Sequence, residues 1–188
     1  FIDDYQVFID NILQEISEED IYSVFTESSV RLVFTASKGY EFNNTSLTYI
    51  SNTFSDIEQT ISQDRKTLTV VWGNFVDDIE FVVEALPSLN TITIGDISDR
   101  FISIEFNGES VDVTGGTYSI RSDVDLIVTA TLRYGYMDGQ ATSTIEEFIV
   151  SQSCEYDRSD GNYHLTVNID NINDNFTLSF TSTERTYN

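Results

Sequence analysis

The sequence predicts an all-β protein made of two tandem antiparallel β-sandwich domains. Three observations lead to this prediction: a composition that favours strands, repeated alternation of apolar and polar residues, and similarity between the two halves of the chain. Thr, Ser, Val, Ile, Phe and Tyr dominate the 188 residues, which include 13 Phe and 10 Tyr but one Met. β-Branched and aromatic side chains suit a pleated, half-buried surface, so most of the chain is expected to form strands.

Apolar residues recur at every second position in the first half of the chain. Segments 30–36, 67–72 and 79–83 each place their apolar side chains on one face, the period of a half-buried strand. The start is ambiguous, because apolar residues from Tyr5 to Ile16 fit a helical stripe, whereas Gln6 to Asp10 also fits a strand. We expect the strand, because residues 91–97, the corresponding stretch after Pro87, read as one.

The second half continues the pattern with short turns. Strands are expected at 91–94, 101–106, 124–131, 163–169 and 176–180, separated by Asn107-Gly108, Gly115-Gly116, Asp138-Gly139 and Asp160-Gly161-Asn162. Asn, Asp and Gly tolerate positive φ, so these pairs are typical of hairpin turns. Short strands joined by short turns indicate sandwiches rather than parallel α/β units.

The two halves repeat one another. Residues 28–36 match 122–130, with Val30 falling on Val124, 94 residues later, and Leu68 falls on Leu165 at an offset of 97. The predicted domains are therefore 1–87 and 88–188, joined near Pro87. Each length suits a seven-stranded sandwich of about 100 residues. The matching residues are core apolars and turn formers, which specify a fold and not a chemistry.

This order of elements resembles a known class of module. The resemblance is carried by 30–36, Gly39-Tyr40, 68–70 and 74–83, together with their second copies. Such elements are similar to the Ig-like modules found in tandem in surface proteins of Gram-positive bacteria, and in tail, fibre and head-decoration proteins of their phages. The resemblance implies Ig-like sandwich domains and a location on a virion surface or outside the cell, at the cell surface.

Charge and composition exclude several functions. The chain carries 32 acidic and 9 basic residues, a formal net charge of −23. Nucleic-acid binding is not expected, because it needs a basic face, and an anionic membrane surface is disfavoured by the same repulsion. Membrane insertion is not expected either, because no apolar run approaches the roughly 18 to 20 residues of a spanning helix. The one Cys, Cys154, and the one His, His164, cannot build an intrachain disulfide or a Cys/His zinc site.

Two acidic features invite a chemical interpretation. The run Asp170-Asn171-Ile172-Asn173-Asp174-Asn175 has the oxygen ligands that calcium prefers, but the repeat aligns it with residues 74–78, inside the module, where a structural turn is the favoured interpretation. Carboxylate doublets occur at Asp3-Asp4, Glu18-Glu19, Asp77-Asp78 and Glu146-Glu147. Adjacent strand residues point to opposite faces, so these doublets are expected to be solvated rather than catalytic pairs.

Other single residues have a functional and a structural interpretation. His164 should face solvent, because Leu165, Val167 and Ile169 face inward. Cys154 is expected to be a free, half-buried thiol. A sugar-binding platform formed by Trp72, Tyr134, Tyr136 and Tyr156 is the alternative to core packing, and we expect core positions for Trp72, Tyr134 and Tyr136.

We therefore expect a non-enzymatic structural or interaction protein of a virion appendage, with no catalytic, cofactor-binding or metal-binding residues assigned and no cofactor. Its expected partners are other virion or surface subunits, including further copies of itself, and a host-surface glycan. A bacterial cell-surface adhesin or a carbohydrate- or Ca-dependent binding module is the alternative. Contacts are expected in the variable middles, 51–63 and 141–160, because loops on a rigid sandwich commonly bind ligands. Because the chain begins at Phe1, it is expected to be a mature product or a piece of something longer.

Overall fold

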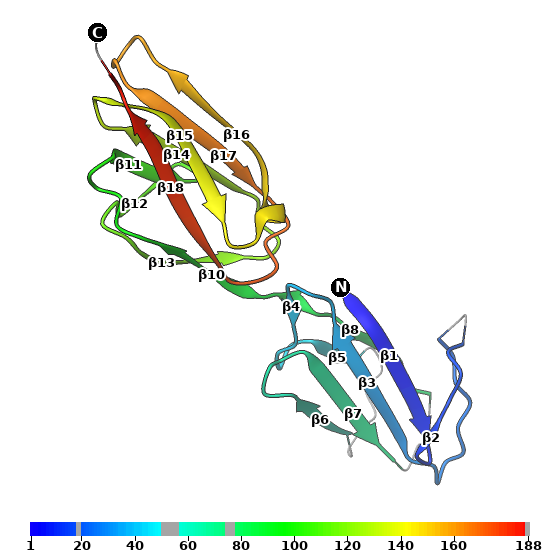
Figure 1. Cartoon of the computed structure of the whole chain (residues 1–188). Helices are drawn as coiled ribbons and strands as arrows, with labels where there is room; N and C mark the ends of the chain where they lie inside the picture. The colour runs from blue at the N-terminus through cyan, green and yellow to red at the C-terminus, as the bar shows by residue number, and fades with distance from the viewer. Residues whose placement is uncertain (18–19, 50–56, 74–77, 187–188) are drawn as a thin grey trace. The chain divides into compact units, whose positions relative to one another are not determined.

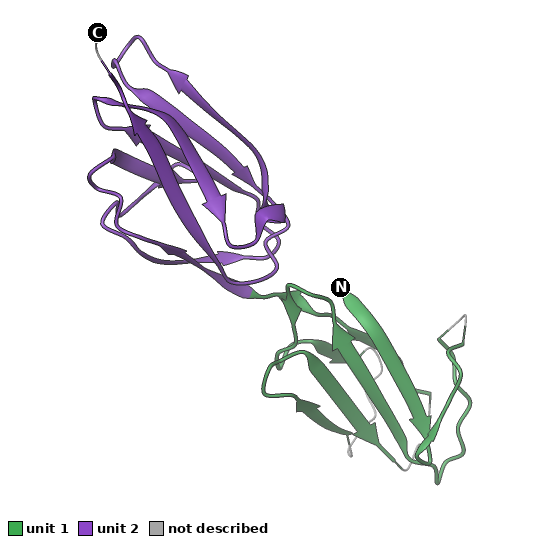
Figure 2. Cartoon of the chain, in the orientation of Figure 1, with its two compact units in different colours: residues 1–88 green, residues 89–188 purple. Residues whose placement is uncertain are grey.

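The computed structural model describes residues 1–17, 20–49, 57–73 and 78–186. The chain divides into Phe1–Ser88, called unit 1, and Leu89–Asn188, called unit 2 (Figure 2). Within the described residues the regular elements are strands, apart from one 3₁₀ turn, η1 (Glu146–Phe148). The predicted all-β sandwich fold is confirmed. None of the described residues forms a helix long and apolar enough to cross a membrane.

Unit 1 has a five-stranded sheet in the order β2-β1-β3-β7-β6 and two short strand pairs, β4-β9 and β5-β8 (Figure 1). Its strands are β1 (Ile2–Ile9), β2 (Ile12–Leu13), β3 (Val30–Ala36), β4 (Tyr40–Glu41), β5 (Leu47–Tyr49), β6 (Ile57–Ile61), β7 (Thr67–Trp72), β8 (Phe81–Val83) and β9 (Leu86–Pro87). The alternating apolar residues of β3 and β7 face one core, which also buries Phe42 and Ala85. All pairings in this unit are antiparallel within the described residues.

The start of the chain is a strand, as expected for residues 6–10, and the helical alternative is wrong. β1 pairs with β3 from Ile2 to Ile9 and turns into β2 through Asp10 and Asn11, whose φ angles are 50° and 63°. Two successive positive φ values suit a tight hairpin turn. Ile12 and Leu13, which a helical stripe would bury, are exposed.

Unit 2 has two facing sheets, β13-β10-β18-β15 and β12-β11-β14-β17-β16 (Figure 1). Its strands are β10 (Leu89–Ile94), β11 (Phe101–Phe106), β12 (Glu109–Val111), β13 (Gly116–Arg121), β14 (Leu126–Leu132), β15 (Tyr136–Ser143), β16 (Ile149–Tyr156), β17 (Tyr163–Ile169) and β18 (Phe176–Glu184). The core between the sheets contains Phe101, Leu165 and Leu178, all fully buried. The strand order β11-β14-β17-β16 repeats the order β1-β3-β7-β6 of unit 1. β1 therefore corresponds to β11, and the expected correspondence of the start of the chain with residues 91–97 is wrong, because residues 91–94 belong to β10 in the other sheet.

Two features of unit 2 differ from the sequence expectation. β10 and β18 pair in parallel, from Ile92–Phe176 to Ile94–Leu178, in a fold expected to be antiparallel. Parallel neighbours are possible here because the rest of the unit connects them. Asp138-Gly139 is not a hairpin turn: it lies inside β15, where Asp138 has φ 52° and the register with β18 shifts. Residues that tolerate positive φ are common in turns, and the same tolerance permits a β-bulge.

Candidate functional site

The outer face of the β13-β10-β18-β15 sheet carries many hydroxyl side chains. Alternation along these strands points Ile92, Leu178 and Phe180 into the core and leaves mostly hydroxyl and amide side chains outside, together with Leu89, Arg121 and Asp138 near the strand ends. We call this surface the hydroxyl face; it consists of Thr117 and Ser119 on β13, Thr91 and Thr93 on β10, Thr177, Ser179, Thr181 and Thr183 on β18, and Gln140, Thr142 and Thr144 on or after β15. None of these eleven side chains carries a charge.

The strand register aligns these residues into rows across the sheet. Thr93 is the partner of Thr117 on one side and of Thr177 on the other. Thr177 in turn forms two hydrogen bonds with Thr144. The Thr177 N–H donates to the Thr144 Oγ1 at 3.0 Å, and the Thr177 carbonyl accepts from the Thr144 N–H at 3.0 Å. A single row of four threonines therefore crosses the sheet from β13 to the turn after β15.

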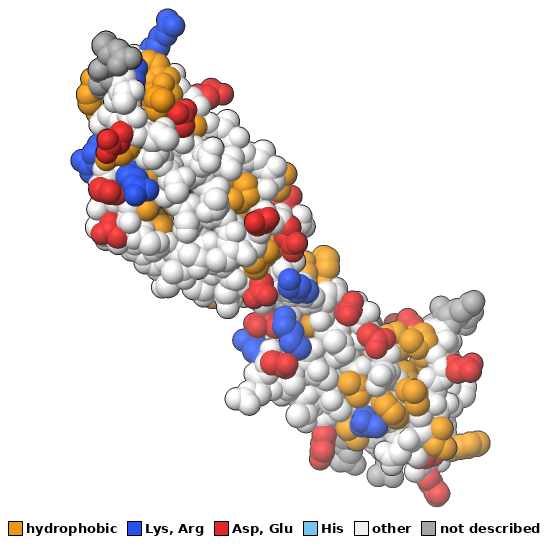
Figure 3. Space-filling model, in the orientation of Figure 1, with side chains coloured by type: hydrophobic (Ala, Val, Ile, Leu, Met, Phe, Trp, Pro, Cys, Tyr) orange, Lys and Arg blue, Asp and Glu red, His pale blue; other side chains and the backbone are white. Residues whose placement is uncertain are grey.

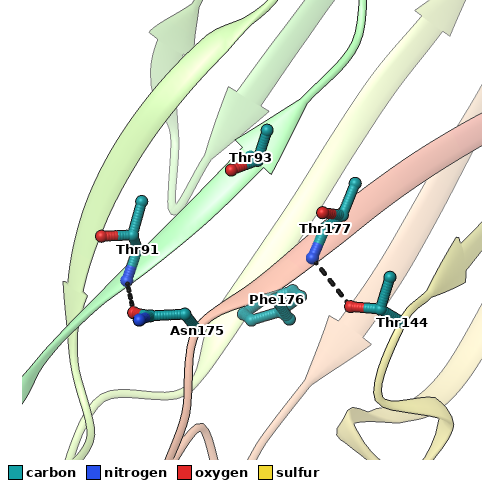
Figure 4. Close-up of a pocket in the computed structure, with 6 residues that line it drawn as sticks. All are labelled: Thr91, Thr93, Thr144, Asn175, Phe176 and Thr177. Atoms are coloured by element: carbon teal, nitrogen blue, oxygen red, sulfur yellow. Dashed lines mark hydrogen bonds between the residues drawn. The ribbon is translucent and has the colours of Figure 1, made fainter.

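A depression lies in the hydroxyl face where this row meets the start of β18 (Figure 4). It is lined by Thr91, Thr93, Thr144, Asn175, Phe176 and Thr177. The Asn175 Oδ1 accepts a hydrogen bond from the Thr91 N–H at 2.7 Å, which fixes the amide at the rim (Figure 4). Phe176 is almost fully buried, so the depression offers mainly hydroxyl and amide groups to a ligand.

The hydroxyl face stands out because the chain is strongly acidic. The formal net charge is −23, yet the region of β10, β15 and β18 is largely free of charged side chains (Figure 3). A second acidic macromolecule that approaches elsewhere meets like charge, and desolvating a carboxylate is costly. Hydroxyl groups, in contrast, both donate and accept hydrogen bonds at low desolvation cost. This face is therefore suited to contact with a partner.

The hairpin between β16 and β17 holds an acidic cluster. Asp157, Asp160 and His164 each bring one metal-ligand atom within 4.8 Å of the others. Asp157 accepts the Ser159 N–H at 2.7 Å and Asp160 accepts the Asn162 N–H at 2.9 Å, and these bonds hold the pKa of both carboxyls below the usual value. Asp160 also lies 2.9 Å from the His164 Nε2. The cluster is accounted for by the bonds that close the hairpin turn.

Aromatic side chains gather at the same hairpin. The Tyr156 and Tyr163 rings lie 5.2 Å apart, and the Arg185 guanidinium is 5.6 Å and 5.8 Å from their centres. Trp72, in contrast, is buried in unit 1, as expected, and takes no part in an exposed platform. The expected core position of Tyr134 is wrong: it is 72% exposed, because it lies in the turn beyond Leu132, the last inward residue of β14.

The remaining candidate residues are placed as follows. Tyr136 is half-buried against the core of unit 2, and Cys154 is a free, half-buried thiol, as expected. Burial raises the pKa of this thiol. His164 lies on the outer side of β17, half-buried, beside the Thr131 hydroxyl at 3.2 Å. The segment 170–175 is the turn between β17 and β18, in which Ile172 is fully buried.

The carboxylate doublets do not form facing pairs where they are described. Asp3 and Asp4 are exposed beside a register shift in β1. Glu146 and Glu147 are exposed, as expected. They lie in η1 and not on a strand, so their exposure does not come from strand alternation. Glu18, Glu19 and Asp77 lie outside the described residues, as does the 51–56 part of the first variable middle.

The second variable middle, 141–160, contains the end of β15, η1 and β16 and contributes Thr142 and Thr144 to the hydroxyl face. The rest of that face was not anticipated. The sequence signal was the spacing of Thr91 and Thr93, and of Thr177, Ser179 and Thr181, at alternate positions. Comparisons of the chain with protein-family models, curated proteins and solved structures found no match.

Proposed function

We propose that the chain is a non-enzymatic structural and interaction protein of a virion appendage, in which tandem Ig-like modules act as a spacer or attachment surface. The observation that carries this proposal is the hydroxyl face, a largely uncharged and regular surface on a strongly acidic chain. Acidic surfaces keep neighbouring copies on a particle apart, while an uncharged face permits one selected contact.

The hydroxyl face also suits the partners of such a protein. Its side chains stand on hydrogen-bonded strands, so little conformational freedom is lost when a partner binds. Rows of groups that donate and accept hydrogen bonds match a hydroxyl-rich glycan on a host surface, or the polar edge of another subunit. A bacterial cell-surface adhesin or a carbohydrate-binding module would use the same face, and is the second candidate.

Location on the particle is the direct test. Antibodies raised against the 188-residue chain would be applied to virus particles and to host cells from the source culture and imaged by electron microscopy. Label at regular positions on particles is the expected result. Label confined to the cell surface would reject the virion assignment in favour of the adhesin.

The role of the hydroxyl face is tested separately with charged variants. Thr93→Glu and Thr181→Glu place a carboxylate on exposed positions of that face, and Ser153→Glu does the same on exposed β16 of the other sheet as a matched control. The first two variants should lose attachment to particles or cells, while the control retains it. Equal attachment by all three would show that contact is made elsewhere.

A further inference from the structure

The two sheets of unit 2 approach each other at their edge strands. β15 ends the β13-β10-β18-β15 sheet and β16 ends the other sheet, and the two strands contact each other (Figure 1). Among the described residues each of them pairs with a single strand, β15 with β18 and β16 with β17. One side of each strand therefore has backbone N–H and C=O groups that face no partner strand, and such an edge is where a further strand can add.

Side chains of β16 take the place of a partner strand for β15. The Ala141 N–H donates to the Gln152 Oε1 at 2.8 Å, and the Gln152 Nε2 donates to the Ala141 carbonyl at 3.2 Å. One side-chain amide thus supplies the acceptor and the donor that a neighbouring backbone would supply. Two residues away on each strand, the Gly139 N–H donates to the Cys154 Sγ at 3.2 Å. We call these contacts the edge bridge.

Strand register explains why Gln152 and Cys154 reach β15. Their partners on β17 are Val167 and Leu165, which are fully buried between the two sheets. Residues directly opposite each other on neighbouring strands have their side chains on the same face of the sheet. Gln152 and Cys154 therefore point toward the other sheet, although β16 lies at the rim of the sandwich.

Ala141 depends on Gln152 for hydrogen bonds of its backbone. Ala141 is 1% exposed, so water has almost no access to its N–H and C=O groups. A buried donor or acceptor that loses its partner carries the full cost of desolvation. Loss of the Gln152 amide would therefore leave two buried groups of β15 unpaired or force the edge of β15 to open.

We propose that the edge bridge closes the β15 edge against strand addition, and that without it β15 pairs with the β15 of a second copy of the chain. Two identical edge strands can pair antiparallel about a two-fold axis, so one open edge on each copy is enough for a dimer. Asp138 is the one charged residue of β15, so the two strands themselves repel weakly. The inference does not rest on the proposed function.

Unit 1 provides a matched control residue. Gln59 on β6 pairs with Val70, the repeat of Val167, so it has the register position on β6 that Gln152 has on β16. Gln59 is exposed, and within the part of the chain that the structure describes its side chain forms no hydrogen bond. The same substitution at the two positions therefore differs in the hydrogen bonds that it removes.

Residue-resolved hydrogen exchange of backbone amides tests the edge bridge itself. Gln152→Met removes both hydrogen bonds to Ala141 from an exposed residue and leaves the core intact, whereas Gln59→Met removes none. Exchange of the Ala141 amide should be faster by about tenfold or more in Gln152→Met and unchanged in Gln59→Met. In Cys154→Val, faster exchange should be confined to the Gly139 amide. Equal exchange of the Ala141 amide in wild type and Gln152→Met would overturn the proposal.

Sedimentation velocity tests the protection against strand addition. Association is followed at about 1 M NaCl, where a Debye length of about 3 Å screens the repulsion between chains of net charge −23. Gln152→Met should form more dimer than wild type or Gln59→Met at the same protein concentration. Exchange of its Ala141 amide should slow again as the dimer forms, because the second β15 replaces the lost partners. Equal dimer in the three proteins, or a dimer in which Ala141 exchanges as fast as in the monomer, would refute the protective role.

Discussion

The substitution Leu165→Ala tests whether the repeat apolars form the core of unit 2. Leu165 is fully buried in β17, and its register partners on the two neighbouring strands are Ala130 and Cys154. Loss of three carbon atoms removes about 2.5 kcal/mol of transfer free energy. The small side chains beside it cannot close the resulting cavity, so we expect a total loss of about 3 to 4 kcal/mol in the free energy of unfolding.

The assay separates the two units by their spectroscopic signals. Far-ultraviolet circular dichroism follows the whole chain, while the fluorescence of Trp72, the one Trp of the sequence, follows unit 1. The dichroism transition of unit 2 should fall by roughly 15–25 °C. Ile127→Ala, on the outward side of β14 where Ile127 is 48% exposed, is the control and should cost less than about 0.5 kcal/mol. Equal losses in both variants would refute the core assignment, as would a matching shift of the Trp72 transition.

Three further predictions concern single residues. Burial raises the pKa of Cys154, so its alkylation at pH 8 should be slower in the folded protein than in urea; equal rates would contradict this. Hydrogen bonds, chiefly from the Ser29 backbone, lower the pKa of Asp10, so their stabilising effect is present above the unfolded pKa of about 3.9 and is lost as pH falls through the folded value. The melting temperatures of wild type and Asp10→Asn should therefore differ at pH 6 and converge at pH 2, and a constant difference would reject the linkage. Gly139→Ala brings a Cβ to 3.0 Å from a Leu132 methyl and should cost about 1 to 3 kcal/mol in urea unfolding, whereas an unchanged midpoint would show that this methyl moves freely.

Residues with a strong local pattern were predictable from the sequence. The strands at 30–36, 67–72, 101–106 and 163–169 were expected with the bounds that the structure has, because their alternation is uninterrupted. Asp138-Gly139 was expected to form a turn but forms a bulge in β15, because a residue with positive φ occurs in both. Tyr134 was expected in the core but is exposed, because β14 ends at Leu132 and Tyr134 lies in the turn that follows. Local patterns therefore define strands better than they define where strands end.

The candidate site was less predictable, because it depends on strand order. Thr93 and Thr177 are 84 residues apart in the sequence and become neighbours only through the parallel pairing of β10 and β18. Alternation places each of them on an outer face, but it does not determine which strands share that face.

The parallel pairing of β10 and β18 also determines how unit 2 bears mechanical load. The chain enters the unit at the start of β10 and leaves it after the end of β18. Tension along the polypeptide therefore pulls the two strands in opposite directions along their own axes. The hydrogen bonds between them are loaded together in shear, whereas a hairpin pulled at its open end loses them one at a time. This pair is expected to set the force that unit 2 withstands.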